Sequence, residues 1–227
     1  MSQDAPNQLP GPRPSAPGPS KNVIGIFGGT FDPVHYGHLR IALDAIEMLG
    51  LAQVRLVPLS QAVHRDQPQT PGQLRQQMLE AAIAGRSDML VDDRELRRDG
   101  PSYTVDTLRS LREELPNESL CLLVGEDAFA GFADWRAPNE ILRLANIAVL
   151  QRPGHQLPDD PDLQALLAAH RVDRLDPATH GQIVICPVTQ LEIASSDIRR
   201  RLGEGLNIDF LLPDSVVDLI RNHRLYR

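Results

Sequence analysis

The 227-residue chain has few cysteines and no long apolar run, and each shortage excludes a class of protein. Its two cysteines, Cys121 and Cys186, lie in the apolar segments LCLLV and IVICPV. A small buried thiol suits such segments better than a disulfide or a metal ligand does. No apolar stretch approaches the roughly 18 residues that a membrane-spanning helix needs. We therefore expect a cytoplasmic protein.

The chain also lacks an excess of positive charge. Lys and Arg number 23, Asp and Glu number 30, and the formal net charge is −7. This balance argues against a general affinity for nucleic acid, which depends on many Lys and Arg side chains. We expect neither a nucleic acid nor a membrane as a partner, and any phosphate binding must be local. A homo-oligomer is compatible with the sequence.

The first twenty residues contain six prolines among Ser, Gly, Ala and Gln, and no apolar centre of a signal peptide. We predict a disordered Pro-rich tail over 1–21, with a short docking site for a partner as the alternative. The remainder, 22–227, is long enough to bury a core and is predicted to be a single domain.

Short runs rich in Val, Ile and Leu alternate with helix-like stretches beyond the tail. This alternation is typical of an α/β protein with a doubly wound, mostly parallel sheet. The strands are expected at residues 23–27, 54–58, 89–91, 120–124, 147–150 and 183–186. The helices are expected at residues 38–49, 70–85, 102–115 and 213–227, with a further possible helix at 162–170. Thr70 is a plausible N-cap, and Gly50 a plausible end, for two of them.

The segment GIFGGTFDPVHYGH, at 25–38, joins the first strand to the first helix. Helix N-termini at this edge of a parallel sheet present free N–H groups to anions. Gly28 and Gly29 allow the backbone to approach a ligand, and His35 and His38 share one face of the helix start. Surface histidines or metal ligands are the alternatives, but the neighbouring glycines favour a phosphate site. The spacing matches neither the Rossmann fingerprint nor a P-loop.

The string GGTFDPVHYGH resembles the signature of the nucleotidyltransferase superfamily marked by H-x-G-H, in particular the bacterial nicotinate-nucleotide adenylyltransferases. Four further segments match that family in order, so the resemblance covers residues 23–227: PLSQAVHR, PSYTVDTL, GEDAF with the following Trp, and IASSDIR. The chain departs from the family pattern at Val63, Ala194 and Ser196, and at Arg136, where the family often has Tyr.

The resemblance implies a Rossmann-like nucleotidyltransferase fold and a set of site residues. Those implied to be catalytic are His35, His38 and Arg199. Those implied to bind ATP are Gly28, Gly29, His35, His38, Asp127, Ser195, Ser196 and Arg199. Those implied to bind the second substrate are Thr30, Phe31, His64, Arg65, Thr104 and Trp135.

Several of these residues also have a structural interpretation. On composition alone Trp135 is interpreted as a core or edge residue, whereas the resemblance places it against the pyridine ring of the substrate, which stacking would favour. Asp127 suits either a ribose hydroxyl or a helix N-cap. Ser195 and Ser196, with Asp197, are plausible caps for the helix that carries Arg199.

Four arginines need separate interpretations. Arg200 and Arg201 fit a solvated helix face, whereas Arg199 matches the family motif. Arg136 suits either an anionic nicotinate or solvent, and Thr104, at a helix start, is implied to lie near the nicotinate carboxylate.

The resemblance implies adenylyl transfer from ATP to nicotinate mononucleotide, with release of pyrophosphate. The attacking phosphate is already an anion, so catalysis reduces to positioning and charge stabilisation. We expect no metal site built by the protein, and Mg²⁺ carried mainly by ATP. The rivals are transfer to nicotinamide mononucleotide or phosphopantetheine, a non-catalytic nucleotide-binding module, and a detached tRNA-synthetase-like domain.

Overall fold

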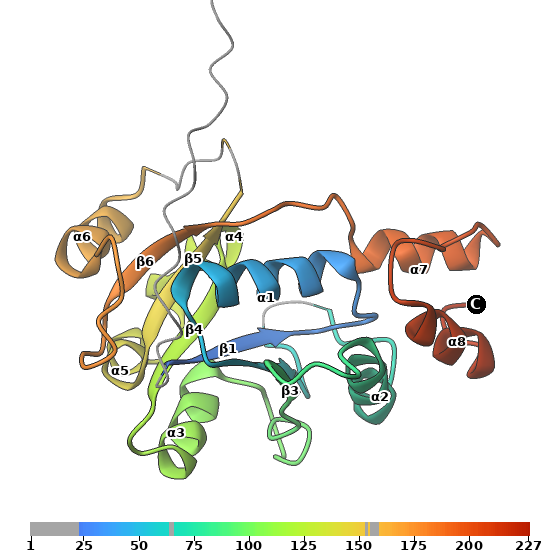
Figure 1. The fold of residues 1–227 in the computed structure, drawn as a ribbon, viewed down its shortest axis with the longest axis horizontal. Coiled ribbons are helices and arrows are strands. Elements are labelled where there is room, and N and C mark those ends of the chain that lie inside the picture. Colours follow the sequence, from blue (N-terminus) through green and yellow to red (C-terminus); the bar gives the residue numbers. More distant parts are fainter. Residues whose placement is uncertain (1–22, 64–65, 153, 155–158) are drawn as a thin grey trace, which may run out of the picture.

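Six parallel strands form one sheet in the order β3-β2-β1-β4-β5-β6 (Figure 1). The computed structural model describes residues 23–63, 66–152, 154 and 159–227, so the tail predicted at 1–21 lies outside it. The strands are β1 (Val23–Gly29), β2 (Gln53–Pro58), β3 (Met89–Val91), β4 (Ser119–Gly125), β5 (Asn146–Gln151) and β6 (Ile183–Pro187). Each contains one of the predicted strand segments, and the doubly wound parallel α/β fold is confirmed.

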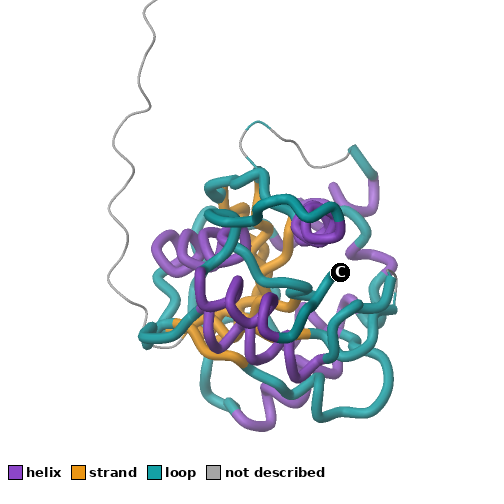
Figure 2. The backbone as a smooth tube through the Cα atoms, turned by 90° about the vertical axis from the view of Figure 1, so that its right-hand side faces the viewer, coloured by secondary structure: helices purple, strands orange, loops and turns teal. Residues whose placement is uncertain are grey.

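Helices cover both faces of this sheet (Figure 2). One apolar cluster joins one face to α1 (Tyr36–Leu49), α2 (Gly72–Ala82), α7 (Ser195–Gly203) and α8 (Asp214–Asn222). The other cluster joins the opposite face to α3 (Thr104–Glu114), α4 (Glu126–Phe129), α5 (Pro138–Leu144), α6 (Pro161–His170) and the 3₁₀ turn η1 (Phe132–Asp134). Within the described ranges, no helix has the length and apolarity needed to cross a membrane.

The central strand β4 shows why the sequence forms this arrangement. Leu120, Leu122 and Val124 point into one cluster, while Cys121 and Leu123 point into the other. A strand covered on both faces is apolar at every position rather than at every second one. Burial of each Leu contributes roughly 2 kcal/mol. Cys121 is a free thiol within this core, as predicted.

The carboxyl ends of β1 and β4 separate from each other. β1 pairs with β2 as far as Gly29 and Pro58, but with β4 only as far as Ile26 and Leu122. In this strand order the chain connections leave β1 and β4 in opposite directions, which is where open α/β sheets bind ligands. The topology therefore places the predicted glycine loop beside a crevice.

Two predicted helix ends have different outcomes. Gly50 ends α1 with a left-handed φ of 63°, as expected. The N-cap prediction for Thr70 is wrong, because Pro71 is the N-cap and α2 begins at Gly72. The Thr70 N–H donates instead to the carboxylate of Asp32, 3.4 Å away. The possible helix at 162–170 is present as α6.

Candidate active site

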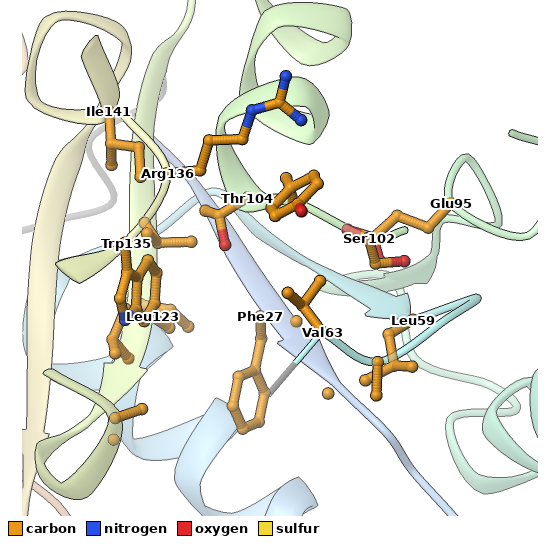
Figure 3. Close-up of a pocket in the computed structure, with 18 of the residues that line it drawn as sticks. Phe27, Leu59, Val63, Glu95, Ser102, Thr104, Leu123, Trp135, Arg136 and Ile141 are labelled. Atoms are coloured by element: carbon orange, nitrogen blue, oxygen red, sulfur yellow. The ribbon is translucent and has the colours of Figure 1, made fainter. Parts of the chain in front are cut away.

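A cavity of about 360 Å³ opens where β1 and β4 separate (Figure 3). β1 contributes Gly28 and Gly29 to its wall, and β4 contributes residues 122–125. A Cβ atom added to Gly28 would have no heavy atom within 4 Å. The backbone at Gly28 therefore lies open toward this space.

Trp135 and Thr104, two of the predicted substrate residues, line the same cavity (Figure 3). The half-buried Trp135 ring packs against Phe132, with their centroids 5.5 Å apart. Thr104 begins α3, and the first N–H groups of a helix have no acceptor inside it. The cavity thus combines a flat aromatic wall with a helix N-terminus that favours negative charge.

Arg136 lies at the rim of the cavity. Its guanidinium carbon sits 4.5 Å from the centroid of the Tyr103 ring, and Nη1 is 3.6 Å from the Asp106 carboxylate. The side chain is 55% exposed. Arg136 therefore adds a positive charge at the edge of the site, but one that is already shared with Asp106.

Hydrogen bonds hold the cavity wall around Ser102 in place. The Ser60 N–H donates to Ser102 Oγ (2.9 Å), and the Ser102 N–H donates to the Gln61 carbonyl (3.0 Å). Behind it, Thr107 Oγ1 donates to Glu95, another residue of the wall, and burial raises the pKa of this carboxyl. The sequence did not single out Glu95, because it lies in the charged run DDRELRRDG.

His35 and His38 stack on each other at the start of α1. Their ring centroids are 3.8 Å apart and their planes make an angle of 29°. The His35 backbone N–H donates to His38 Nδ1 over 3.4 Å. In a neutral His38 whose Nδ1 accepts a bond, the proton sits on Nε2, which is then a donor. The Phe31 ring packs against His38 in a T-shaped arrangement, with the two ring centroids 5.0 Å apart.

Burial keeps this pair uncharged near neutral pH. It lowers the pKa of His35 from its ordinary value of 6.5 to about 4. For His38, burial and then repulsion from the His35 imidazolium lower the pKa well below 6.5. Within the described residues, Nδ1 of the buried His35 has no hydrogen-bond partner. An anion nearby would shift both pKa values back upward.

Two glycines of the signature are required by packing around these rings. A Cβ atom on Gly37 would lie 2.9 Å from His35 Nδ1, and one on Gly29 would lie 2.8 Å from the Phe31 ring. Any side chain at these positions would displace the rings. The glycine of H-x-G-H thus makes room for the first histidine, while Gly28 serves the open cavity.

Helix α7 is tied to the loop that precedes His35. Ser195 Oγ donates to the Pro33 carbonyl (2.9 Å), and Arg199 Nη1 donates to the Asp32 carbonyl (2.8 Å). The predicted capping role of the serines is wrong, because Ala194 is the N-cap and makes no side-chain cap bond. The Ser195 hydroxyl bonds across to the other segment instead.

The three arginines of α7 have different surroundings. Arg200 and Arg201 both pair with Asp197, at 2.5 and 3.1 Å, on the exposed side of the helix. Arg199 turns toward the glycine loop, and in the described part of the chain no carboxylate pairs with it. Ser196 is exposed at the same helix start.

Arg75 is a buried residue that the sequence interpretation missed. Only 1% of it is exposed, and its guanidinium donates to the carbonyls of Thr30 (2.8 Å), Leu59 (2.8 Å) and Thr70 (3.0 Å). It therefore holds the loops after β1 and β2 together. Arg75 lies three positions before Met78, on the apolar face of α2, and this helical spacing was the one signal in the sequence that Arg75 is buried.

Comparison with known proteins places the chain in a family. A family model described as cytidylyltransferase-like matches residues 26–201, more than half of the sequence. The chain belongs to the cytidylyltransferase-like family.

Several relatives within this family are similar over nearly their whole length. A probable nicotinate-nucleotide adenylyltransferase of Methylococcus capsulatus is 46% identical over 208 residues, covering 90% of this chain and 99% of that protein. One from Hydrogenovibrio crunogenus is 42% identical over 208 residues, covering 92% and 99%. The resemblance seen in the motifs therefore extends across the domain.

Two solved structures share the fold of this chain. The nicotinic acid mononucleotide adenylyltransferase of Plasmodium falciparum complexed with NaAD superposes with a TM-score of 0.67 at 18% identity, covering 90% of this chain and 97% of that one. A putative nicotinate-nucleotide adenylyltransferase of Vibrio parahaemolyticus gives 0.61 at 22%, covering 91% and 96%. At these identities the similarity concerns the fold.

The remaining site residues of this cytidylyltransferase-like chain fall in different places. Phe31 is 1% exposed, so its ring supports His38 from the core and lies outside the cavity wall. Thr30 is half-buried, and its carbonyl accepts Arg75. Asp127, 73% exposed, pairs with Arg152 at 2.8 Å, and Gly125 rather than Asp127 is the N-cap of α4. His64 and Arg65 lie outside the described residues.

Proposed function

We propose that this protein transfers the adenylyl group of ATP to nicotinate mononucleotide, giving nicotinate adenine dinucleotide and pyrophosphate. Relatives of 42–46% identity that match the chain over almost their entire length bear the corresponding name. The reaction belongs to NAD biosynthesis.

One structural observation carries the proposal. The cavity lined by Trp135 and the N-terminus of α3 opens from the same loop of glycines that leads to the stacked His35 and His38. Trp135 stacks on the pyridine ring, and the helix N-terminus at Thr104 favours the nicotinate carboxylate. The histidines and Arg199 lie beyond the glycines, where the phosphates of ATP meet the attacking phosphate.

The reaction needs no general base. The 5′-phosphate of nicotinate mononucleotide is an anion, attacks the α-phosphorus of ATP in line, and pyrophosphate leaves. His38 donates its Nε2–H to a phosphate oxygen, and Arg199 supplies a fixed positive charge. Burial keeps both imidazoles neutral in the free protein. Negative charge that accumulates on the nearby phosphates raises the pKa values of the two histidines, so their interaction with the phosphates strengthens as the reaction proceeds.

Mg²⁺ is part of this proposal as an ion carried by ATP. Among the described residues, no three His, Cys, Asp or Glu side chains come together as a metal site. An Mg²⁺ ion held mainly by the phosphate oxygens of ATP would neutralise charge on the triphosphate. Gly28, Gly29, Ser195, Ser196 and Asp127 complete the proposed ATP site.

A cytoplasmic location and a local rather than general affinity for phosphate complete the proposal. Cys121 and Cys186 are free thiols buried in the core, as suits a reducing compartment. We propose that His64 and Arg65 also contact phosphate, on the strength of the family motif alone.

The test is pyrophosphate release by the full-length protein with ATP, Mg²⁺ and either nicotinate or nicotinamide mononucleotide. We expect turnover only when a mononucleotide is present, and a kcat/KM roughly 10-fold higher for the acid, because a helix N-terminus favours a carboxylate. If the protein released no pyrophosphate with either mononucleotide, the enzyme assignment would be overturned. Equal kcat/KM for both would overturn the role given to α3.

A further inference from the structure

The end of the chain returns to the glycine loop. After α8, Arg224 and Tyr226 take left-handed φ values of 52° and 62°, and the Leu225 N–H donates to the Ile220 carbonyl. Residues without glycine's freedom adopt such values only where surrounding contacts hold them. Figure 1 shows this end of the chain beside α7 and α8. The turn brings the penultimate side chain to a residue 194 positions earlier.

That residue is Asp32, which joins four segments of the chain. Its Oδ1 accepts the Tyr226 hydroxyl (2.5 Å), and its Oδ2 accepts the backbone N–H groups of Gln69 (2.7 Å) and Thr70 (3.4 Å). Its carbonyl accepts Arg199 (2.8 Å). The glycine loop, the lead into α2, α7 and the C-terminal segment therefore meet at one residue that is 2% exposed. The lead into α2 and the C-terminal segment contact its carboxylate, and α7 contacts its backbone carbonyl.

The charges at this point are balanced inside the protein. Buried Arg75 attracts Asp32 electrostatically and donates to carbonyls of the same two loops. Burial, and then the hydrogen bond to Asp32, raise the pKa of Tyr226, so its hydroxyl stays protonated and remains a donor. A buried network of this kind holds one geometry only when every member is satisfied.

We propose that Tyr226 is a positioning residue for adenylyl transfer, because its hydroxyl fixes Asp32 and thereby the loop that carries His35 and His38 relative to Arg199. Asp32 lies three residues before His35, so a shift of this carboxylate moves the histidine pair. The inference rests on the function proposed above. Tyr226 is not among the residues that line the cavity, so its effect on the rate would act through Asp32.

The test is Tyr226→Phe, which removes one hydroxyl and keeps the ring. We expect kcat to fall about 10-fold, because small misplacements of catalytic groups cost this much or more, while KM for nicotinate mononucleotide stays within about twofold. Deletion of the exposed Arg227 alone is the matched control and should leave kcat unchanged. Leu225→Ala, which weakens apolar packing of the same segment, should lower the melting temperature without lowering kcat at a temperature where the variant is folded.

The outcomes separate positioning from stability. Wild-type kcat in Tyr226→Phe would overturn the proposal. So would parallel losses of kcat in Tyr226→Phe and Leu225→Ala, because the hydroxyl would then act only through stability. A wild-type protein without adenylyl transfer would overturn the proposed function itself, and this inference with it.

Discussion

The two halves of the site are built differently. The half at His35 and His38 is densely packed: the rings stack at 3.8 Å, and His35 is only 5% exposed. The half at Trp135 is an open cavity of about 360 Å³, with a half-buried indole and an exposed Arg136 at its rim. Charge stabilisation needs donors fixed before the substrate arrives, whereas recognition of a flat ring needs an accessible surface.

This difference leads to a division of labour. The packed half should act on the rate of the chemical step, because its donors meet charge that develops in the transition state. The open half should act on substrate affinity, because stacking is nearly the same before and during reaction. Variants in the two halves should therefore change different kinetic constants.

The largest effect is expected for His38→Ala. Loss of one donor to the reacting phosphates should lower kcat about 100-fold to 1,000-fold, with KM for nicotinate mononucleotide within about threefold. Steady-state kinetics with both substrates varied provides the measurement. His180→Ala, at an exposed histidine, is the control. A mainly raised KM would place His38 in the affinity half and break the comparison.

Arg199→Ala should come next, with a fall in kcat of about 100-fold through loss of a fixed charge at the phosphates. Arg200→Ala, one residue away on the exposed face, should change kcat by less than about twofold, because surface ion pairs contribute little. The pair is assayed side by side at equal protein concentration. Similar losses in both variants would show that α7 acts as a whole.

The buried His35 should make stability depend on pH. Its folded pKa of about 4 lies below the ordinary 6.5, so as pH falls the unfolded chain binds the proton first. The contribution of the neutral His35 to the free energy of unfolding is therefore fully present above about pH 6.5, and it is lost as pH falls toward 4. When the pH is lowered from 8 to 5, the free energy of unfolding should fall further in the wild type than in His35→Gln, by about 2 kcal/mol.

Urea unfolding at several pH values measures this difference. His180→Gln, which alters an exposed histidine, should leave the pH dependence of the wild type unchanged. Parallel pH curves for wild type and His35→Gln would mean that His35 is not held neutral by burial.

The smallest effect is expected for Trp135→Ala, which should raise KM for nicotinate mononucleotide about 10-fold through lost stacking, with KM for ATP unchanged. Trp135→Phe keeps a ring and should recover part of the affinity. A change confined to the KM for ATP would place the ring against the wrong substrate.

The sequence predicted what local patterns encode. Continuous apolar runs located six strands, and the step from a strand to a helix located the glycine loop and its histidines at the carboxyl edge of the sheet. These features depend on residues a few positions apart, so their periodicity is visible along the chain.

The supports of the site depend on contacts that no local pattern contains. Ser195 reaches Pro33 across 162 positions, and Arg199 reaches Asp32 across 167. A serine at a helix start reads as a cap, and only the fold shows that its hydroxyl has another acceptor. Phe31, next to the glycines, read as a substrate contact, but its ring fills the space that Gly29 leaves.

The single tryptophan of the chain permits the most direct test of the division of labour. Because Trp135 lines the cavity, nicotinate mononucleotide should change its fluorescence, and a titration gives the Kd. We expect the same saturating fluorescence change and the same Kd in the wild type and in His38→Ala, although the turnover of this variant is strongly reduced. No fluorescence change in the wild type, or a Kd that rises in His38→Ala in step with the loss of turnover, would contradict it.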